Sequence, residues 1–225
     1  MITAKRAWAL IGGLGEPGKM PGWSYSLPIA DCRVGRKLAK VPGTVCFGCY
    51  AAGRRYSWPA MKRAMRRRLR ALRRPAPDWC AAMVKLLDAQ RWFRWFDAGD
   101  LQSVEHLRRI ARVAELTPWC MHWLPTREVA TVRAFVRAGG RFPANLVVRL
   151  SGTWIDGPPP AVSPELYAAG VRTSTVHKDR PATGFECRAA APIPGRPGRH
   201  YAPSCDTCRA CWDRSNENTS YRFHT

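Results

Sequence analysis

The feature that most constrains this fold is a repeated alternation of strand-like and helix-like segments in the middle of the chain. Short apolar and aromatic runs predict strands at 92–96, 119–124, 145–150 and 171–176. Helical spacing of apolar residues predicts helices at 103–116 and 128–138, the first of them capped by Ser103. The units recur about every 27 residues, which is the pattern of right-handed βαβ units in a parallel sheet.

Chain length limits how many such units are present. A complete eight-unit (β/α) barrel needs about 250 residues, whereas this chain has 225. We therefore predict an α/β fold, with a partial (β/α) barrel over residues 1–180 and a small cysteine-rich extension over 181–225. An open parallel sheet is the alternative. Ahead of the repeats, the sequence predicts a short strand around 25–27 and then two helices at 58–74 and 79–90.

Three cysteines between the first strand and these helices have a spacing that predicts a metal site: Cys32, Cys46 and Cys49. The apolar run at 7–11 is too short for a signal peptide, and no stretch reaches the ~18 apolar residues of a membrane span. We therefore expect a cytoplasmic protein with reduced thiols and no membrane partner. Three cysteines on a four-iron cubane would leave one iron open, whereas a structural zinc would take a fourth ligand from elsewhere. These residues alone fit both metals.

A second group of cysteines lies in the C-terminal segment and comprises Cys187, Cys205, Cys208 and Cys211. The Cys-x2-Cys-x2-Cys run with a distant fourth cysteine is similar to the run that wraps a ferredoxin cubane, whereas zinc ribbons carry separated pairs. We predict an auxiliary four-iron cluster here, with structural zinc as the alternative. Cys80 and Cys120 have no partner at ligand spacing and are predicted to be core residues.

The charge balance points to a polyanionic partner. Lysine and arginine number 37 against 16 acidic residues, which gives a formal net charge of +21. Much of the excess lies on the predicted helix at 58–74, which carries no carboxylate, and the candidates for phosphate contacts are Lys62, Arg63, Arg66, Arg67, Arg68, Arg70, Arg73 and Arg74. A solvated helix face is the ordinary interpretation of such a run, but these cations repel one another unless an anion is near. We predict a nucleic-acid partner, with DNA favoured over RNA.

Polar side chains follow each predicted strand, and the carboxyl ends of parallel strands meet at one rim. In chain order these candidates are Asp97, Asp100, Arg127, Glu128, Ser151 and His177. Each has an ordinary interpretation as a turn residue, a helix start or a surface histidine. Their coincidence at strand ends favours a shared cavity that faces the first three cysteines.

The first cysteines and the second strand end together resemble the radical SAM (S-adenosylmethionine) superfamily. Cys49-Tyr50 is similar to the last cysteine and aromatic residue of that cluster loop, and Ala98-Gly99-Asp100 stands where its Gly-Gly-acid motif ends the second strand. The first cysteine gap is thirteen residues here, instead of the usual three. The resemblance implies two four-iron clusters, S-adenosylmethionine, an electron donor and a 5′-deoxyadenosyl radical. It also implies Asp97 and His177 as catalytic groups, and as cofactor ligands Tyr50, Ala98, Gly99, Asp100, Arg127, Arg149 and Ser151.

Five sequence blocks resemble more closely a family of mostly uncharacterised bacteriophage gene product proteins. They lie at 27–28, 45–51, 99–103, 123–128 and 208–212. This resemblance implies action in the host cytoplasm and favours hypermodification of DNA bases. A non-catalytic basic DNA-binding protein with structural zinc or iron–sulfur sites is the alternative function.

Overall fold

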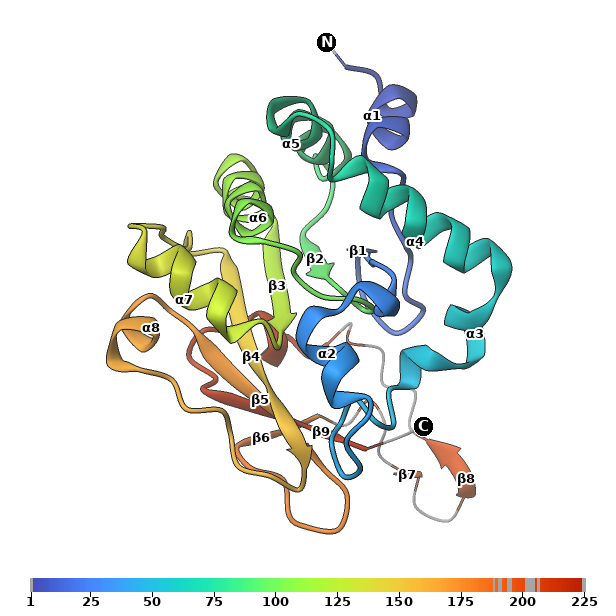
Figure 1. Ribbon diagram of the computed structural model, residues 1–225, viewed down its shortest axis with the longest axis vertical. Coiled ribbons are helices and arrows are strands. Elements are labelled where there is room, and N and C mark those ends of the chain that lie inside the picture. Colours follow the sequence, from blue (N-terminus) through green and yellow to red (C-terminus); the bar gives the residue numbers. More distant parts are fainter. Residues whose placement is uncertain are drawn as a thin grey trace.

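A seven-stranded sheet in which every strand is parallel to its neighbours organises the computed structural model (Figure 1). The structure describes residues 2–187, 189, 192–193, 196–200, 205 and 207–223. Across the sheet the strands are β1 (Trp23–Tyr25), β2 (Trp92–Trp95), β3 (Met121–Thr126), β4 (Leu146–Ile155), β5 (Arg172–His177), β9 (Asn218–Arg222) and β6 (Phe185–Cys187). The predicted α/β class with a parallel sheet is confirmed, and the arrangement is compatible with a partial barrel.

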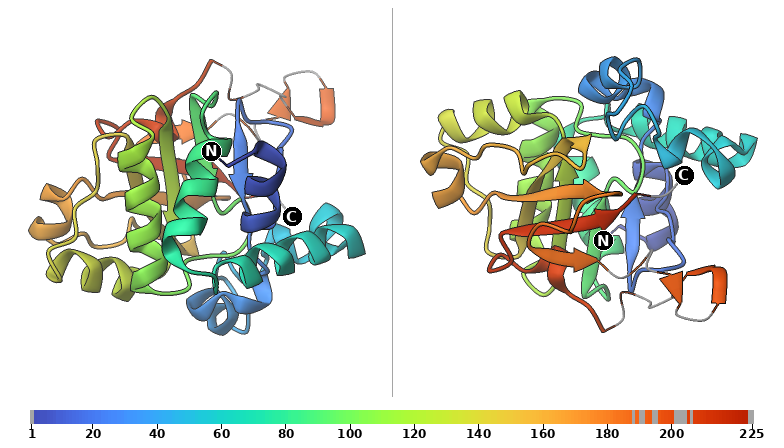
Figure 2. Two further views of the ribbon diagram at one scale, coloured as in Figure 1. Left: turned by 90° about the horizontal axis from the view of Figure 1, so that it is seen from above. Right: turned by 90° about the horizontal axis from the view of Figure 1, so that it is seen from below.

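Helices connect the first five strands and flank the sheet. In chain order they are α1 (Ala4–Ile11), α2 (Arg33–Leu38), α3 (Arg54–Ser57), α4 (Pro59–Ala71), α5 (Ala76–Leu86), α6 (Val104–Leu116), α7 (Val129–Arg137) and α8 (Pro164–Ala168). Short 3₁₀ turns are η1 (Ile29–Asp31), η2 (Tyr50–Ala52) and η4 (Ala210–Trp212). The helices α5 to α8 form an arc along one side of the sheet in Figure 1, and Figure 2 shows this layer from above and the C-terminal strands from below.

The helix α6 begins where the sequence predicted, because Ser103 caps it. The Ser103 Oγ accepts a hydrogen bond from the His106 backbone N–H at 3.1 Å. The sequence predicted no helix ahead of the first strand, but α1 precedes β1. This helix is two turns long and buries only Ala7 and Ile11, which is too few apolar positions for a clear helical period.

The C-terminal segment adds two strands to the main sheet. β9 lies between β5 and β6, although β6 comes earlier in the chain. The side chains of Asn218, Thr219 and Ser220 on β9 are buried but polar, so apolar patterning did not predict this strand. A separate antiparallel pair consists of β7 (Pro192–Ile193) and β8 (Arg196–His200). The domain boundary at residue 180 stays a prediction, although β6 and β9 join residues beyond it to the sheet.

The two faces of β2 serve different purposes. Phe93 and Trp95 are fully buried and pack in the main core beneath the helices, where Trp95 meets Trp79 at 6.1 Å between ring centroids. Because side chains alternate along a strand, Trp92 and Arg94 point to the opposite face, which we call the inner face. Cys80 and Cys120 are buried, as predicted. None of the helices in the described part of the chain has the length and apolar character needed to span a bilayer.

Candidate functional site

Cys32, Cys46 and Cys49, which we call the N-terminal cysteine group, lie on the loop that leaves β1. Cys32 stands immediately before α2, and Gly35 on that helix faces two of the thiols. A Cβ on Gly35 would lie 3.5 Å from the Cys46 Sγ and 3.8 Å from the Cys32 Sγ. The two sulfur atoms therefore lie on the same side of α2, next to Gly35.

The thiols of this group influence one another electrostatically. Burial, together with the nearby charges of Asp100, Cys49 and Cys46, raises the pKa of Cys32 to about 12. Burial also raises the pKa of Cys46, while the Arg127 guanidinium opposes this shift. Such a donor set binds metal only as thiolates, so a bound cationic centre would have to displace the protons.

Asp100 joins the ends of β2 and β3 beside this group. Its Oδ1 accepts from the Thr126 hydroxyl at 2.5 Å, and its Oδ2 accepts from the Arg127 N–H at 2.9 Å. Burial raises the pKa of this carboxyl to about 6, although its hydrogen bonds lower it. Glu128 is also buried and accepts from the Val34 N–H at 2.8 Å, which ties the start of α2 to the end of β3. The predicted gathering of strand-end polar groups beside the cysteines is present for Asp100, Arg127 and Glu128.

The backbone of Ala98 and Gly99 runs against the start of the cysteine loop. The Ala98 carbonyl accepts from the Leu27 N–H at 2.8 Å. Gly99 has φ +81°, and a Cβ there would lie 2.5 Å from the Leu27 carbonyl oxygen. This position therefore requires glycine for both its conformation and its space.

Asp97 is held by three hydroxyl groups at the end of β2. Its carboxylate accepts from Ser24 at 3.1 Å, from Tyr56 at 3.0 Å and from Ser26. The Tyr50 hydroxyl donates to its backbone carbonyl. The predicted cofactor residue Tyr50 and the predicted catalytic residue Asp97 are therefore in direct contact.

Arg94 is a site residue that the sequence prediction missed. Its guanidinium carbon lies 4.4 Å from the Trp123 ring centroid, and its Nη2 lies 3.5 Å from the Tyr50 hydroxyl. Burial alone would lower the pKa of Arg94, but Tyr50 and Asp97 raise it above the usual value. The available signal was a single cation at an inner-face position of an aromatic strand.

The four cysteines 187, 205, 208 and 211, which we call the C-terminal cysteine group, lie near the inner face of the sheet. The Cys211 Sγ is 3.2 Å from the Tyr221 hydroxyl, and Cys211 packs with Trp123 and Trp212. Burial raises the pKa of Cys211 to about 12, and the neighbouring charge of Cys187 adds to this shift. Among the described residues, no three or more His, Cys, Asp or Glu side chains have the geometry to hold one metal ion.

Arg149 does not fit the predicted role of cofactor ligand. It is fully buried, and each of its five N–H groups donates to a backbone carbonyl. The distances run from 2.7 to 3.1 Å, and the acceptors are Cys211, Thr173, Asn216, Ala210 and Asp213. No donor is left for a cofactor, so Arg149 anchors the C-terminal cysteine group instead.

His177 does not share the predicted cavity either. Its Nδ1 lies 2.8 Å from the Ser220 Oγ, and its Nε2 lies 3.4 Å from the Glu186 Oε1. Ser220 and Glu186 alternate along their strands with Tyr221 and Cys187, which belong to the inner face. His177 is therefore on the outer face, opposite the C-terminal cysteine group.

Ser151 and Arg127 remain accessible at the rim. Both are partly exposed, the Ser151 hydroxyl lies 3.4 Å from that of Ser174, and the Arg127 Nε donates to the Gly152 carbonyl at 3.2 Å. Arg127 is close enough to Cys46 for its charge to act on that thiol, and within the described part of the chain no partner is recorded for its Nη atoms.

The predicted cations of α4 and the turn after it are exposed, with one exception. The exposed ones are Lys62, Arg63, Arg66, Arg67, Arg70, Arg73 and Arg74. Arg68 is 3 % exposed and its Nε donates to the Gly13 carbonyl at 2.9 Å, so it does not belong to the basic outer face. Burial lowers the pKa of Arg68.

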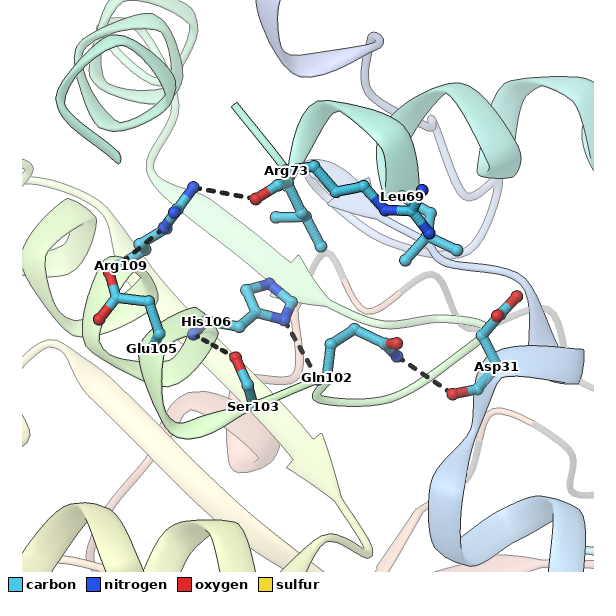
Figure 3. A pocket seen from close by; sticks show the side chains of 9 residues that line it. Asp31, Leu69, Arg73, Gln102, Ser103, Glu105, His106 and Arg109 are labelled. Atoms are coloured by element: carbon cyan, nitrogen blue, oxygen red, sulfur yellow. Dashed lines mark hydrogen bonds and ion pairs between the residues drawn. The ribbon is translucent and has the colours of Figure 1, made fainter. Parts of the chain in front are cut away.

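A pocket of about 230 Å³ lies behind the cysteine loop, between α4 and α6 (Figure 3). Gln102 lines it and donates through Nε2 to the Asp31 carbonyl at 3.3 Å and to the Asp100 carbonyl at 2.8 Å. Gln102 therefore links the backbone of Asp31, the residue before Cys32, to the backbone of Asp100. His106 is buried in the same wall, with its Nδ1 accepting from the Gln102 N–H.

Comparison with known proteins gives a match to a protein family. The family model described as Gene product 88 matches residues 3–214, which is most of the chain. No curated protein matches, and no solved structure matches. This confirms the resemblance to a phage gene product family, and the chain belongs to the Gene product 88 family.

Proposed function

We propose that this protein is a radical SAM-type iron–sulfur enzyme that modifies a nucleic acid, with DNA bases favoured. The observation that carries the proposal is the convergence of Cys32 and Cys46 on Gly35, at a rim that also holds Asp100 and Arg127. In folds of this kind the active site usually lies at the carboxyl ends of the parallel strands.

The N-terminal cysteine group is the proposed holder of the first cluster. The donor set fits a four-iron cluster, because three thiols leave one iron for another ligand. When bound, a reduced cluster of this type supplies one-electron cleavage of S-adenosylmethionine to a 5′-deoxyadenosyl radical. Gly35 lies next to two of the sulfur atoms, of which that of Cys46 belongs to a buried residue and that of Cys32 to a partly buried one.

The chain's own residues bind and orient the proposed cofactor. Arg127 and Ser151 would bind its carboxylate and ribose, and Tyr50, whose hydroxyl donates to the Asp97 carbonyl, would contact it from the end of β2. Asp100 is already bonded to Thr126 and to the Arg127 N–H, so its proposed task is to hold the cofactor-binding backbone in position. Asp97 carries the proposed catalytic task, and Arg94 beside it supplies a positive charge for an anionic substrate.

The C-terminal cysteine group is the proposed holder of an auxiliary cluster. Four thiols would close that site. Because Cys211 packs against Trp123 and Trp212, a second cluster held there would lie beside the inner face of the sheet, where it would shape the substrate entrance or relay an electron from an external donor.

Metal analysis tests the proposal directly. The protein is purified anaerobically, its iron, sulfide and zinc are measured, and an EPR spectrum of the reduced protein is recorded with and without S-adenosylmethionine. The expected result is about eight irons per chain and a spectrum that S-adenosylmethionine perturbs. Two zinc ions and no iron would overturn the enzyme proposal.

A non-catalytic nucleic-acid-binding protein with structural metals is the second candidate. The observation in its favour is that the buried Arg149 donates to the backbone carbonyls of Cys211 and Ala210, which is a structural role next to the C-terminal cysteine group. The seven exposed cations of α4 and its following turn would then be the functional surface. A gel-shift assay with DNA and RNA at several salt concentrations tests nucleic-acid binding for both candidate functions. Absent or salt-insensitive binding would overturn the proposed nucleic-acid partner.

A further inference from the structure

A groove between α1 and α4 lies apart from both cysteine groups. Its volume is about 610 Å³, within the ~300–1,000 Å³ that is usual for ligand sites. We call it the Trp8 groove, and its lining residues are Trp8, Ala9, Gly12, Arg67, Arg70, Ala71 and Arg74. Three of these are arginines, and none is acidic.

The close approach of α1 to α4 shapes this groove. Gly12 ends α1 with φ +78°, and a Cβ there would lie 2.7 Å from the Arg67 carbonyl carbon. The end of α1 therefore rests on the backbone of α4, which only glycine permits. This contact fixes the distance between Trp8 and the arginines of α4.

Trp8 is exposed although its ring is held in position. The indole meets Trp23 edge-on, with 6.0 Å between ring centroids, and 43 % of the residue is exposed to solvent. A Cβ on Gly13 would lie 2.8 Å from the Trp8 Nε1, so the chain also packs closely against one edge of the ring. A supported but exposed indole is a ready stacking surface for a planar group.

The three arginines form one charged row. Arg67 and Arg70 lie one turn apart on α4, Arg74 lies in the turn that follows it, and all three line the groove. All three are exposed, and within the described part of the chain no ion pair involves them. Like charges at this spacing destabilise a helix, and a row of anions beside it would remove that repulsion.

We propose that the Trp8 groove binds a single-stranded segment of nucleic acid, with an unpaired base stacked on Trp8 and its phosphates on Arg67, Arg70 and Arg74. The chemistry favours a single strand over a duplex, because only an unpaired base offers its face to an indole. This inference rests on the proposed function for the class of polymer. It adds a site that holds the strand apart from both cysteine groups.

Fluorescence anisotropy of a labelled 20-nucleotide single strand, titrated with the full-length protein at several salt concentrations, tests the charged row. The test variant is Arg67→Gln/Arg70→Gln/Arg74→Gln. The matched control is Arg133→Gln/Arg137→Gln/Arg141→Gln, which removes the same charge from three exposed arginines on and after α7. The groove variant should bind at least about 100-fold more weakly. The slope of log binding constant against log salt concentration should become shallower by about 2, because each of the three phosphate contacts contributes ~0.7. The control should change affinity less than about 10-fold.

Trp8 is tested by a pair of substitutions in the same assay. Trp8→Ala should weaken single-strand binding by about 10-fold or more, whereas Trp8→Phe should keep most of it because a ring remains. Circular dichroism of each variant verifies the fold. The same sequence annealed into a duplex, and vesicles of anionic phospholipid, are the competing probes.

The outcomes separate this inference from the proposed function. Equal weakening by the two arginine triples, tighter binding of the duplex, or preferential binding of the vesicles would each overturn the Trp8 groove as a single-strand site. In those cases the iron content and the cleavage of S-adenosylmethionine still stand as tests of the enzyme. If the wild-type protein binds no nucleic acid, both the groove and the proposed substrate class are wrong.

Discussion

Arg149 donates its Nε–H to the backbone carbonyl of Cys211 at 3.1 Å, and this bond joins the centre of the sheet to the C-terminal cysteine group. The two residues are 62 positions apart in the chain. The other four N–H groups of Arg149 also donate to backbone carbonyls, and those of Ala210 and Asp213 lie before and after Cys211 in the chain. A buried cation without a carboxylate partner is rare, and here backbone dipoles replace the missing counter-ion.

We expect Arg149→Met to destabilise the protein by about 3 kcal/mol or more, because it leaves buried carbonyls without donors. Denaturant unfolding under anaerobic conditions measures the effect, and metal analysis should show loss from the C-terminal cysteine group first. Arg133→Met, on the exposed face of α7, is the control and should stay within about 0.5 kcal/mol of wild type. A cost below 1 kcal/mol for Arg149→Met would contradict the anchoring role.

Gly99→Ala and Gly139→Ala separate steric clash from backbone strain. Both glycines have positive φ, +81° and +76°, so each alanine pays a similar conformational cost of about 1 kcal/mol. Only at Gly99 would the new Cβ meet the Leu27 carbonyl, at 2.5 Å, while nothing lies within 4 Å at Gly139. Gly99→Ala should therefore be clearly more destabilising in thermal or denaturant unfolding. Equal costs for the two variants would show that the cysteine loop moves away from Gly99 without difficulty.

The parallel sheet was predictable because its central strands are apolar and regularly spaced. Strands β2 to β5 and helices α6 and α7 lie within a few residues of the predicted positions. Strands β6 and β9 were not predictable from periodicity, since β9 is polar and buried at Thr219 and Ser220. Tertiary hydrogen bonding, rather than an apolar pattern, stabilises those strands.

The candidate site was predictable as far as residue types and strand ends determine it. The position of Asp100 at the rim follows from a parallel topology, whereas Cys32 and Cys46 approach each other within one loop, as their spacing predicted. The side of the sheet on which a strand residue lies depends on register. The sequence does not give that register, and His177 was therefore predicted on the side of the cysteines although it lies on the outer face. Arg149 was misassigned because a buried arginine and a ligand arginine look the same in a sequence.

Stability should rise with pH between about 3 and 6.5 because two histidines are buried in neutral form. Burial lowers the pKa of His106 and of His122 to about 3. The unfolded chain, with histidine pKa values near 6.5, binds more protons than the native state in that window, so the stabilisation present above 6.5 is lost as the pH falls. Each group contributes on the order of 4 kcal/mol across the window.

His106→Gln and His122→Gln test this pH dependence, each compared with wild type over the same pH range. The comparison removes the contribution of every group that titrates equally in both proteins. Each variant should have a flatter profile of the free energy of unfolding against pH. Profiles that stay parallel to wild type would show that these histidines become charged without unfolding.

Cys49→Ala separates the enzyme from the structural alternative. For a radical enzyme, losing one ligand of the N-terminal cysteine group should abolish cleavage of S-adenosylmethionine. Nucleic-acid affinity should stay within about 3-fold of wild type, because Cys49 packs against the cluster around the buried Met65 of α4, whereas the arginines proposed to contact phosphates are exposed. Cys208→Ala, in the C-terminal cysteine group, is the companion variant and should remove the other metal. If Cys49 anchors a structural metal instead, its loss should lower stability and nucleic-acid affinity together, and S-adenosylmethionine should bind neither protein.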